Sequence, residues 1–314
     1  MQLFHWHAPR GNFGDDMNQW FWDDVLPGWR DWAAPGHLIG VGSLLTTGLA
    51  LPAGVKIVAG AGAGYGQPPP MDPADWDIRF VRGPRTAAAL GLPATAALTD
   101  SAVMTARLPR FAERATGGQT LFVPHWESDV HPDYDWPAIC RSAGIGYLSP
   151  RGDSQEVIRA IAGSRLVLAE SLHAAILADA FRVPWRPVRS GVGGFKIFKW
   201  LDWTDSMEVR FEALELFAPI TRLRGLVRRG APAKEVSGKD AAATFDPEAP
   251  PVADRPPPTL RARVRDKVRA LVAARELARA ARLTPFLSAD RVLESRLDRG
   301  AELLRGLARD YGGA

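Results

Sequence analysis

A strand-to-helix junction between residues 166 and 177 carries the strongest chemical signal in the sequence. Residues 166–169 (Leu-Val-Leu-Ala) form an apolar run typical of a buried strand, and a helical pattern begins at Ser171. Ser171, Leu172 and His173 are therefore expected in the first helical turn, where unpaired N–H groups and the helix dipole favour a bound anion. A histidine there can donate to a phosphate or carboxylate, or act as acid or base. Alternatively, Ser171 only caps the helix and His173 packs in the core.

His125 follows a second predicted strand, residues 120–123. Ligands of open α/β sheets bind outside the carboxyl ends of the strands, so this side chain is also expected to reach the ligand. The alternative is a loop histidine whose ring is satisfied by its neighbours. Two cations are further candidates, because Arg82 precedes a predicted helix and Lys199 precedes an aromatic residue. For Lys199 the alternative is an exposed lysine that belongs to no site.

The N-terminal turn, residues 9–18, offers carboxylates instead. It is a glycine-rich connection between a predicted strand and a predicted helix. It has neither the Gly-x-Gly-x-x-Gly spacing of dinucleotide-binding proteins nor the lysine of a P-loop. Asp15 and Asp16 stand at the expected helix start, where their charges oppose a bound phosphate. They either complement the helix dipole or meet a neutral, hydroxylated substrate, in which case Asp15 orients or deprotonates a hydroxyl.

Neither metal nor covalent chemistry is predicted. Cys140 is the single cysteine, which excludes an intramolecular disulfide and a thiolate ligand set, so the cytosol is the expected compartment. His5 and His7 share one strand face without a third ligand at suitable spacing. The sequence has no Gly-x-Ser-x-Gly elbow of a serine hydrolase. No metal and no cofactor are therefore expected.

Short apolar runs alternate with helical patterns before residue 230, which predicts parallel sheets covered by helices. The expected strands are residues 2–7, 38–41, 56–59, 120–123 and 166–169, and the expected helices are residues 15–26, 86–90, 136–143, 155–162 and 171–181. The pattern restarts after the glycines at positions 117 and 118. We therefore expect two Rossmann-like α/β domains, residues 1–115 and 116–229, which face each other across a cleft.

The C-terminal part differs in composition from this body. Six prolines fall between residues 247 and 258, so residues 230–258 are expected to form an extended linker. Residues 259–314 then predict a tail of two helices. Residues 259–283 carry a net charge of +6 and residues 284–314 none, which leaves −2 for residues 1–258 of a chain with a total of +4. No nucleic-acid partner is therefore expected for the body.

The basic helix of the tail also has an apolar stripe, formed by Leu260, Val264, Val268 and Leu271. Arginines around such a stripe predict contact with an anionic membrane surface. The alternative is a helix that packs back on the body or on a second copy of the chain. The second helix is expected to place Leu293, Leu297, Leu304 and Tyr311 on one side.

Several motifs occur in order along residues 1–205. They lie at residues 10–18 (Arg-Gly-Asn-Phe-Gly-Asp-Asp-Met-Asn), 41–44, 60–66 (Gly-Ala-Gly-Ala-Gly-Tyr-Gly), 81–84 with 99–102, 123–126, 170–176 with 182–185, and 198–203. Together they resemble the motifs of the polysaccharide pyruvyl transferase family. The last segment is similar to one in the succinoglycan-type, ketal-forming branch. The linker and the tail lie outside the resemblance.

The resemblance implies a fold like that of the two-domain GT-B glycosyltransferases. It implies an enzyme that uses phosphoenolpyruvate as donor, forms a cyclic pyruvate ketal on two hydroxyls of one exopolysaccharide sugar, and releases phosphate. The implied acceptor is a lipid-linked oligosaccharide. The chain is thus expected in the cytoplasm, peripheral on the inner face of the membrane. Such chemistry needs an acid that protonates C3 of the donor and a base for the attacking hydroxyl.

The same resemblance suggests residue roles. His173 is the expected ligand of the donor phosphate and candidate acid, His125 is the second candidate for acid or anion contact, and Asp15 orients or deprotonates the acceptor. The expected donor-binding residues are Ser171, Leu172, Arg82 and Lys199, and the expected acceptor-binding residues are Arg10, Asn12, Asp16 and Asn18.

The sequence departs from the family at one point. Many members have Arg-Leu-His where residues 171–173 read Ser-Leu-His, so a cation from elsewhere must hold the donor; the candidates are Arg82, Arg10 and Lys199. Two other functions stay open at this stage. One is a GT-B-like glycosyltransferase that uses a nucleotide sugar, and the other is a non-catalytic carbohydrate-binding protein.

Overall fold

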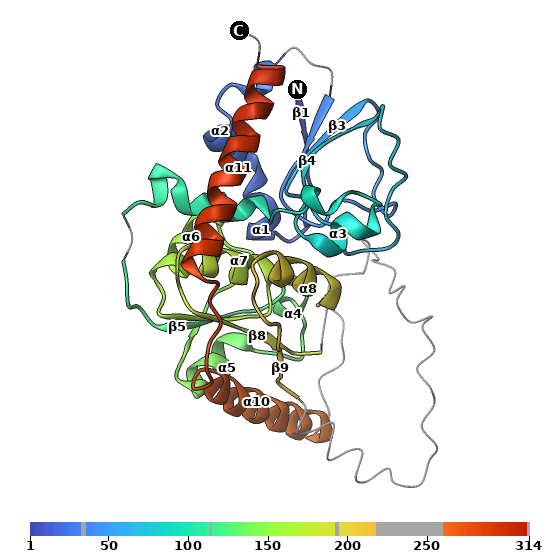
Figure 1. Ribbon diagram of the computed structural model, residues 1–314. Coiled ribbons are helices and arrows are strands. Elements are labelled where there is room, and N and C mark those ends of the chain that lie inside the picture. The colour runs from blue at the N-terminus through green and yellow to red at the C-terminus, as the bar shows by residue number, and fades with distance from the viewer. Residues whose placement is uncertain (33–35, 114, 192–194, 218–259, 313–314) are drawn as a thin grey trace.

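The computed structural model describes residues 1–32, 36–113, 115–191, 195–217 and 260–312, and it contains two sheets (Figure 1). The first sheet has the strand order β1-β2-β3-β4, with β1 (Gln2–Phe4), β2 (Gly36–Ile39), β3 (Val55–Ala59) and β4 (Trp76–Phe80). The second has the order β6-β5-β7-β8-β9, with β5 (Thr120–Val123), β6 (Gly146–Tyr147), β7 (Leu166–Ala169), β8 (Trp185–Arg189) and β9 (Leu214–Glu215). All of these strand pairs are parallel. The predicted linker, residues 230–258, lies outside the described residues.

Helices connect and cover the strands. Between β1 and β5 the chain forms α1 (Phe13–Asp16), α2 (Asn18–Val25) and α3 (Pro84–Ala89), together with the 3-10 helices η1 (Trp29–Asp31), η2 (Ala94–Ala96), η3 (Ser101–Arg107) and η4 (Pro109–Phe111). From β5 onward it forms α4 (Trp126–Asp129), α5 (Trp136–Ala143), α6 (Ser154–Gly163), α7 (Leu172–Ala180) and α8 (Ile197–Ser206). The tail consists of α10 (Leu260–Ala280) and α11 (Asp290–Tyr311).

The two parallel sheets confirm the predicted α/β class and the restart of the pattern near residue 118. The strands β5 and β7 and the helix α5 have the predicted bounds. Asp153 caps α6, with its carboxylate accepting from the N–H groups of Gln155 and Glu156. The predicted helix 15–26 is instead two short helices that meet at Met17.

Four strands were not predicted. β6 and β9 have only two residues each, and charged residues and a proline interrupt the apolar patterns of β4 and β8. In β4, Asp77 and Arg79 form an ion pair of 2.7 Å, and the Tyr311 hydroxyl of α11 donates to Asp77. β8 contains Arg186, Pro187 and Arg189. Neighbouring groups pair with the charged side chains of β4, so this strand can lie under a helix without leaving a charge unpaired.

The helix α11 packs beside the first sheet, against η3 and β4 (Figure 1). Leu293, Leu297 and Leu304 are buried on one side, as predicted. A Cβ atom added to Gly300 would lie 1.8 Å from the Met104 side chain, so α11 approaches η3 closely at this glycine. The described part of the chain contains no helix that is both long enough and apolar enough to cross a membrane.

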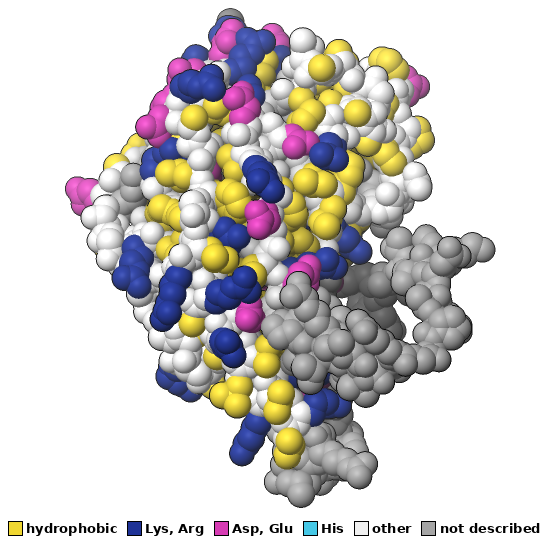
Figure 2. All heavy atoms as spheres, turned by 60° about the horizontal axis from the view of Figure 1, so that its bottom comes forward, with side chains coloured by type: hydrophobic (Ala, Val, Ile, Leu, Met, Phe, Trp, Pro, Cys, Tyr) yellow, Lys and Arg dark blue, Asp and Glu magenta, His cyan; other side chains and the backbone are white. Residues whose placement is uncertain are grey.

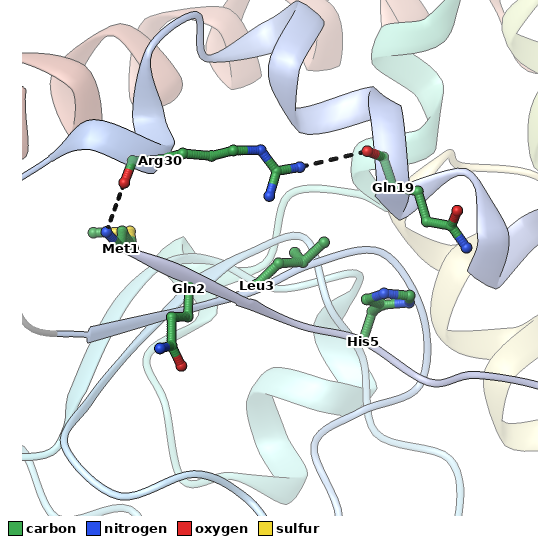
Figure 3. Close-up of a pocket in the computed structure, with 6 residues that line it drawn as sticks. All are labelled: Met1, Gln2, Leu3, His5, Gln19 and Arg30. Atoms are coloured by element: carbon green, nitrogen blue, oxygen red, sulfur yellow. Dashed lines mark hydrogen bonds between the residues drawn. The ribbon is translucent and has the colours of Figure 1, made fainter.

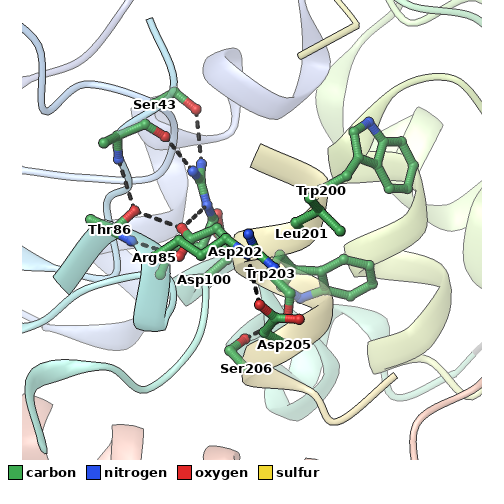
Figure 4. A network of polar contacts seen from close by, with 12 residues as sticks. Ser43, Arg85, Thr86, Asp100, Trp200, Leu201, Asp202, Trp203, Asp205 and Ser206 are labelled. Atoms are coloured by element: carbon green, nitrogen blue, oxygen red, sulfur yellow. Dashed lines mark hydrogen bonds and ion pairs between the residues drawn. The ribbon is translucent and has the colours of Figure 1, made fainter. Parts of the chain in front are cut away.

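The helix α8 lies between β8 and β9 of the second sheet in the sequence, but it packs against α3, next to the first sheet (Figure 1). The buried Asp202 carboxylate joins the two helices (Figure 4). It accepts from the Thr86 N–H at 2.8 Å, from the Thr86 hydroxyl at 2.6 Å and from the Arg82 Nε at 3.0 Å. A Cβ atom at Gly83 would lie 2.0 Å from the Asp202 carbonyl oxygen, so this contact requires glycine. This network fixes α8, and with it Lys199, next to the first sheet.

Replacing Asp202 by alanine is expected to destabilise the protein by about 3–5 kcal/mol, because it leaves the buried Arg82 without its carboxylate. Asp205→Ala is the matched control, since the Asp205–Arg85 ion pair joins the same two helices with both side chains about 40% exposed. It should cost about 0–1 kcal/mol. Chemical denaturation measures both free energies of unfolding. Equal losses in the two variants would contradict the assigned role of Asp202.

Candidate active site

Five polar side chains converge where the carboxyl ends of the two sheets meet. Asp15 comes from α1, Asp100 from the N-cap of η3, His125 from the end of β5, His173 from α7, and Lys199 from α8. The charge of Lys199 acts on three of the others, because it lowers the pKa values of Asp15, His125 and His173. We call these five residues the central cluster. It includes the three residues that were predicted to be catalytic.

Asp15 is 9% exposed and is held from both sides. Its Oδ2 accepts from Asn12 Nδ2 at 2.5 Å, and a Cβ atom at Gly42 would lie 3.2 Å from its Oδ1. Burial raises the pKa of Asp15 to about 7, and the negative charge of Asp100 adds to this rise against the opposing charge of Lys199. A carboxyl group that titrates near neutral pH can accept a proton from a substrate hydroxyl.

His173 lies in the first turn of α7, as predicted, and its ring touches Gly14 of α1. Its Nε2 faces the Asp100 Oδ2 at 3.9 Å. Burial lowers the pKa of His173, and with the charges of Lys199 and Arg82 this pKa falls to about 3. The ring is therefore neutral at pH 7. A bound anion would offset the two cations and raise this pKa again.

Gly14 is required because a Cβ atom at this position would lie 1.9 Å from the His173 Nδ1. Gly14→Ala is expected to displace the imidazole and to lower kcat/KM by about 10²-fold, the usual cost of a misplaced catalytic group. The helix itself should tolerate alanine. Gly48→Ala serves as the control, because its Cβ atom would meet only the Thr46 hydroxyl, at 3.5 Å. A fully active Gly14→Ala enzyme would show that the His173 position does not matter.

Asp100 was not among the predicted site residues. It is completely buried, and its Oδ1 caps η3 by accepting from the Ala102 N–H at 3.0 Å. Its Oδ2 has no hydrogen-bond partner among the described residues and points to His173. Burial raises the pKa of Asp100 to about 6, against the lowering charge of Arg82. An unsatisfied, buried carboxylate oxygen beside a catalytic candidate requires a functional explanation.

Lys199 is buried, so its interpretation as an exposed lysine is wrong. Its Nζ donates to the Tyr65 hydroxyl at 2.7 Å and lies 4.5 Å from the centre of that ring. Within the described ranges it forms no ion pair. A buried ammonium group without a carboxylate partner is costly unless an anion binds it.

Arg82 differs from Lys199 because protein groups already occupy its guanidinium. It is 1% exposed and donates to Asp202, to the Ser43 hydroxyl at 2.8 Å and to the Ala63 carbonyl. Arg10, the third candidate cation, is exposed. Of the three cations, Lys199 is thus both buried and not ion-paired in the part of the chain described.

His125 lies directly after β5, and its ring caps α4. Its Nδ1 accepts from the Glu127 N–H at 3.4 Å, so in the neutral ring the proton is on Nε2. Burial lowers the pKa of His125, and with the charges of Lys199 and Lys196 this pKa falls to about 3. Behind it, the buried Glu170 carboxylate accepts from the His125 N–H at 3.1 Å and from the Ser190 N–H at 2.8 Å. It thereby joins the loops that follow β5, β7 and β8.

Ser171 occupies the N-cap position of α7, but its side chain makes no capping hydrogen bond. The alternative in which Ser171 only caps the helix is therefore wrong. Leu172 is 8% exposed and belongs to the core. The residues that follow it in α7, from Ala174 to Ala180, are all buried, so the N-terminal end of this helix is its polar end.

Three of the four predicted acceptor-binding residues, Asn12, Asp16 and Asn18, lie around Asp15, and the fourth, Arg10, is exposed. Asn12 caps α1 and holds the Asp15 carboxylate, and Asp16 accepts from the Asn12 N–H at 2.9 Å. Asn18 is completely buried, and its amide group makes four hydrogen bonds, with the Asp15 carbonyl, the Trp22 indole and both backbone groups of Val41. It thus ties α2 to the end of β2.

Other polar features lie outside the central cluster. No group of three or more metal-ligating side chains occurs among the described residues. Cys140 is buried, and burial raises the pKa of its thiol to about 12. An open pocket of about 520 Å³ lies beside β1 and is lined by Met1, Gln2, Leu3, His5, Gln19 and Arg30 (Figure 3). Its Arg30 is already partnered by Asp23 and by the Gln19 carbonyl.

Fold and site together define an α/β protein in which two parallel sheets enclose an acid–base cluster with a buried cation. A sequence profile of the family described as polysaccharide pyruvyl transferase matches residues 74–191. The chain is also 41% identical to the succinoglycan biosynthesis protein ExoV of Rhizobium meliloti (strain 1021), over 99% of this chain and 100% of that protein. The chain therefore belongs to the polysaccharide pyruvyl transferase family and is a transferase enzyme.

Proposed function

We propose that the enzyme transfers the carbon skeleton of phosphoenolpyruvate to two hydroxyls of one sugar in an exopolysaccharide repeat unit. Both hydroxyl oxygens bond to C2 of the donor and lose their protons, and the C2–O bond to phosphate breaks. One proton is taken up at C3, which becomes a methyl group, and the other leaves with the phosphate. The products are a cyclic pyruvate ketal and phosphate. The observation that carries this proposal is the buried Lys199, which lies in the central cluster without an ion pair in the described chain.

Lys199 and the start of α7 are proposed to hold the anionic donor. The ammonium group supplies the charge that the family arginine supplies elsewhere, and the Ser171 hydroxyl, which caps no helix, contributes a further donor. Arg82 acts through Asp202, by fixing α8 and thus Lys199. The donor phosphate is proposed to restore a higher pKa to His173, whose ring is neutral without it.

Two groups are proposed to move protons. Asp15, with its pKa of about 7, accepts the proton of the attacking hydroxyl. His173 delivers a proton to C3, and Asp100 positions it through the oxygen that faces Nε2 at 3.9 Å. His125 presents Nε2–H as a neutral donor to the anion. No cofactor takes part in this proposal.

The acceptor is proposed to be neutral, rich in hydroxyls and linked to a lipid, and to enter beside Asp15. Asn12, Asp16 and the exposed Arg10, two residues before Asn12, are proposed to contact the acceptor there, while Asn18 fixes the backbone behind Asp15. We infer a cleft between the two sheets as in GT-B enzymes, and a location on the cytoplasmic face of the membrane. The similarity to ExoV supports a role in the synthesis of a succinoglycan-like polymer.

The direct test incubates the enzyme with phosphoenolpyruvate and a defined oligosaccharide acceptor. We expect one phosphate released for each ketal formed, with phosphate measured colorimetrically and the ketal by mass spectrometry. Phosphoenolpyruvate alone should raise the melting temperature, because it binds the native cluster only. Stabilisation by a nucleotide sugar but not by phosphoenolpyruvate would favour a glycosyltransferase, and binding without phosphate release would favour a non-catalytic protein.

A further inference from the structure

The helix α10 has two opposite faces, and only one of them is covered. Ala273, Ala274, Leu277 and Ala280 are buried, and together with residues of α5 they form a hydrophobic cluster. The helix lies at the end of the molecule away from the first sheet (Figure 1). On this face the helix packs on the body of the protein, which is the alternative to membrane contact that the sequence left open.

The opposite face carries the predicted apolar stripe. Val264, Val268 and Leu271 are 55%, 48% and 68% exposed. Their spacings of four and three residues place them on one side of the helix. Exposed aliphatic side chains are usual singly, but three in a row on one helix face indicate a contact surface.

Arginines continue the same face toward the C-terminal end of α10. Arg275 and Arg279 follow Leu271 at intervals of four residues, so they extend the stripe, and Arg282 lies two residues beyond the end of α10. With Ala278 and Leu283 they line an open hollow of about 440 Å³. Figure 2 turns this end of the molecule toward the viewer and shows dark blue basic side chains around yellow ones at its lower edge.

The two acidic residues of α10 offset only part of this charge, because Arg275 and Arg282 form no ion pair among the described residues. Asp266 is partly buried and pairs with Arg265, and Glu276 is 6% exposed and pairs with Arg279. The outer face thus combines aliphatic side chains with cations. A second copy of the chain is a poor partner for this face, because arginines would meet arginines without acidic residues between them. A nucleic acid is a poor partner as well, because it would leave the aliphatic side chains without apolar contacts.

We propose that the outer face of α10, from Val264 to Arg279, docks together with the adjoining Arg282 on a membrane that contains anionic lipids. The aliphatic side chains enter the interface between headgroups and acyl chains, and the arginines contact the headgroup phosphates. The second sheet would then face the membrane through α5 and α10. This inference goes beyond the proposed reaction, because it concerns a surface that contains no residue of the central cluster.

The test is co-sedimentation of the full-length chain with vesicles of phosphatidylcholine containing phosphatidylglycerol, and with vesicles of phosphatidylcholine alone. We expect binding to the first and much weaker binding to the second.

Two variants of α10 separate the contributions of charge and of apolar contact. The double variant Arg275→Gln/Arg282→Gln should weaken binding by about tenfold or more. The variant Val264→Ser/Val268→Ser/Leu271→Ser should weaken binding at high salt as well, where charge is screened. Arg305→Gln/Arg309→Gln in α11 is the charge-matched control and should bind like the wild type.

Three results would overturn the proposal: equal binding to neutral vesicles, unchanged binding of both α10 variants, or a stable dimer that the serine variant dissolves. Phosphate release with a water-soluble acceptor is measured on the same preparations. That activity should be unchanged in all α10 variants. A loss of vesicle binding with full activity supports the docking surface, while inactivity of the wild type would refute the proposed reaction without bearing on the membrane.

Discussion

Replacing Asp15 by asparagine should lower kcat by about 10²–10⁴-fold, the usual contribution of a general base. The amide keeps the shape of the side chain and can still interact with Asn12, so the turn before α2 should fold normally. In the wild type, kcat/KM should rise with pH through the pKa of about 7 and reach a plateau above it. In the variant this rise should disappear. Steady-state phosphate release between about pH 5 and pH 9 measures both effects.

Asp23→Asn is the matched control for this experiment. Asp23 lies in the adjacent helix α2 and forms a half-exposed ion pair with Arg30. It should leave the rate and its pH dependence unchanged. If Asp15→Asn retained the wild-type rate, the base would have to be another residue.

Although Asp15→Asn should lower the rate, it should increase the stability of the folded protein. Burial raises the pKa of Asp15 from 3.8 to about 7, so the folded state binds this proton more tightly than the unfolded state does. Its contribution to stability is full below about pH 4 and is lost as the pH rises through about 7. The asparagine side chain does not ionise, so the variant does not lose this stability as the pH rises. It should therefore gain stability relative to the wild type between about pH 5 and pH 8, as urea denaturation at the two pH values would show.

Much of the cluster could be predicted because its signals are local. The junction before His173 combines an apolar run with a helical pattern, and both are visible within twelve residues. His125 follows from the same rule, since carboxyl ends of parallel strands converge at one edge of a sheet. These rules predict at which strand or helix end a residue lies. They do not predict its partners or its burial, and burial sets the pKa values in this site.

Asp100 shows what local signals miss. It follows no strand, its acidic character resembles that of many capping residues, and its neighbour His173 lies far along the chain. Lys199 and Arg82 show the same limit in another form. Both were candidates for the missing family arginine, but only the fold reveals that Asp202 holds Arg82 while Lys199 is buried beside Tyr65. The position of α8 beside the first sheet depends on contacts between residues far apart in the sequence, which local patterns do not reveal.

Removing the charge of Lys199 gives the second large effect. Lys199→Met should lower kcat/KM for phosphoenolpyruvate by about 10²-fold, chiefly through a higher KM, because a charge-assisted hydrogen bond to the donor is lost. Lys196→Met is the control, since this partly exposed residue lies three positions away, and it should cost less than about tenfold. Isothermal titration with phosphoenolpyruvate would separate binding from turnover. Wild-type affinity in Lys199→Met would show that the donor binds elsewhere.

The pH profile distinguishes this electrostatic role from a purely structural one. The charge of Lys199 lowers the pKa of Asp15, and the charge of Asp100 raises it. In Lys199→Met the rise of kcat/KM should therefore move to higher pH, whereas in Asp100→Asn it should move to lower pH, together with a loss of kcat as His173 loses its positioning partner. General damage to the fold would lower activity in both variants without moving the two profiles apart. Shifts in opposite directions require that Asp15, Asp100 and Lys199 share one site, and shifts in the same direction would refute the assignment of Asp15 as the base.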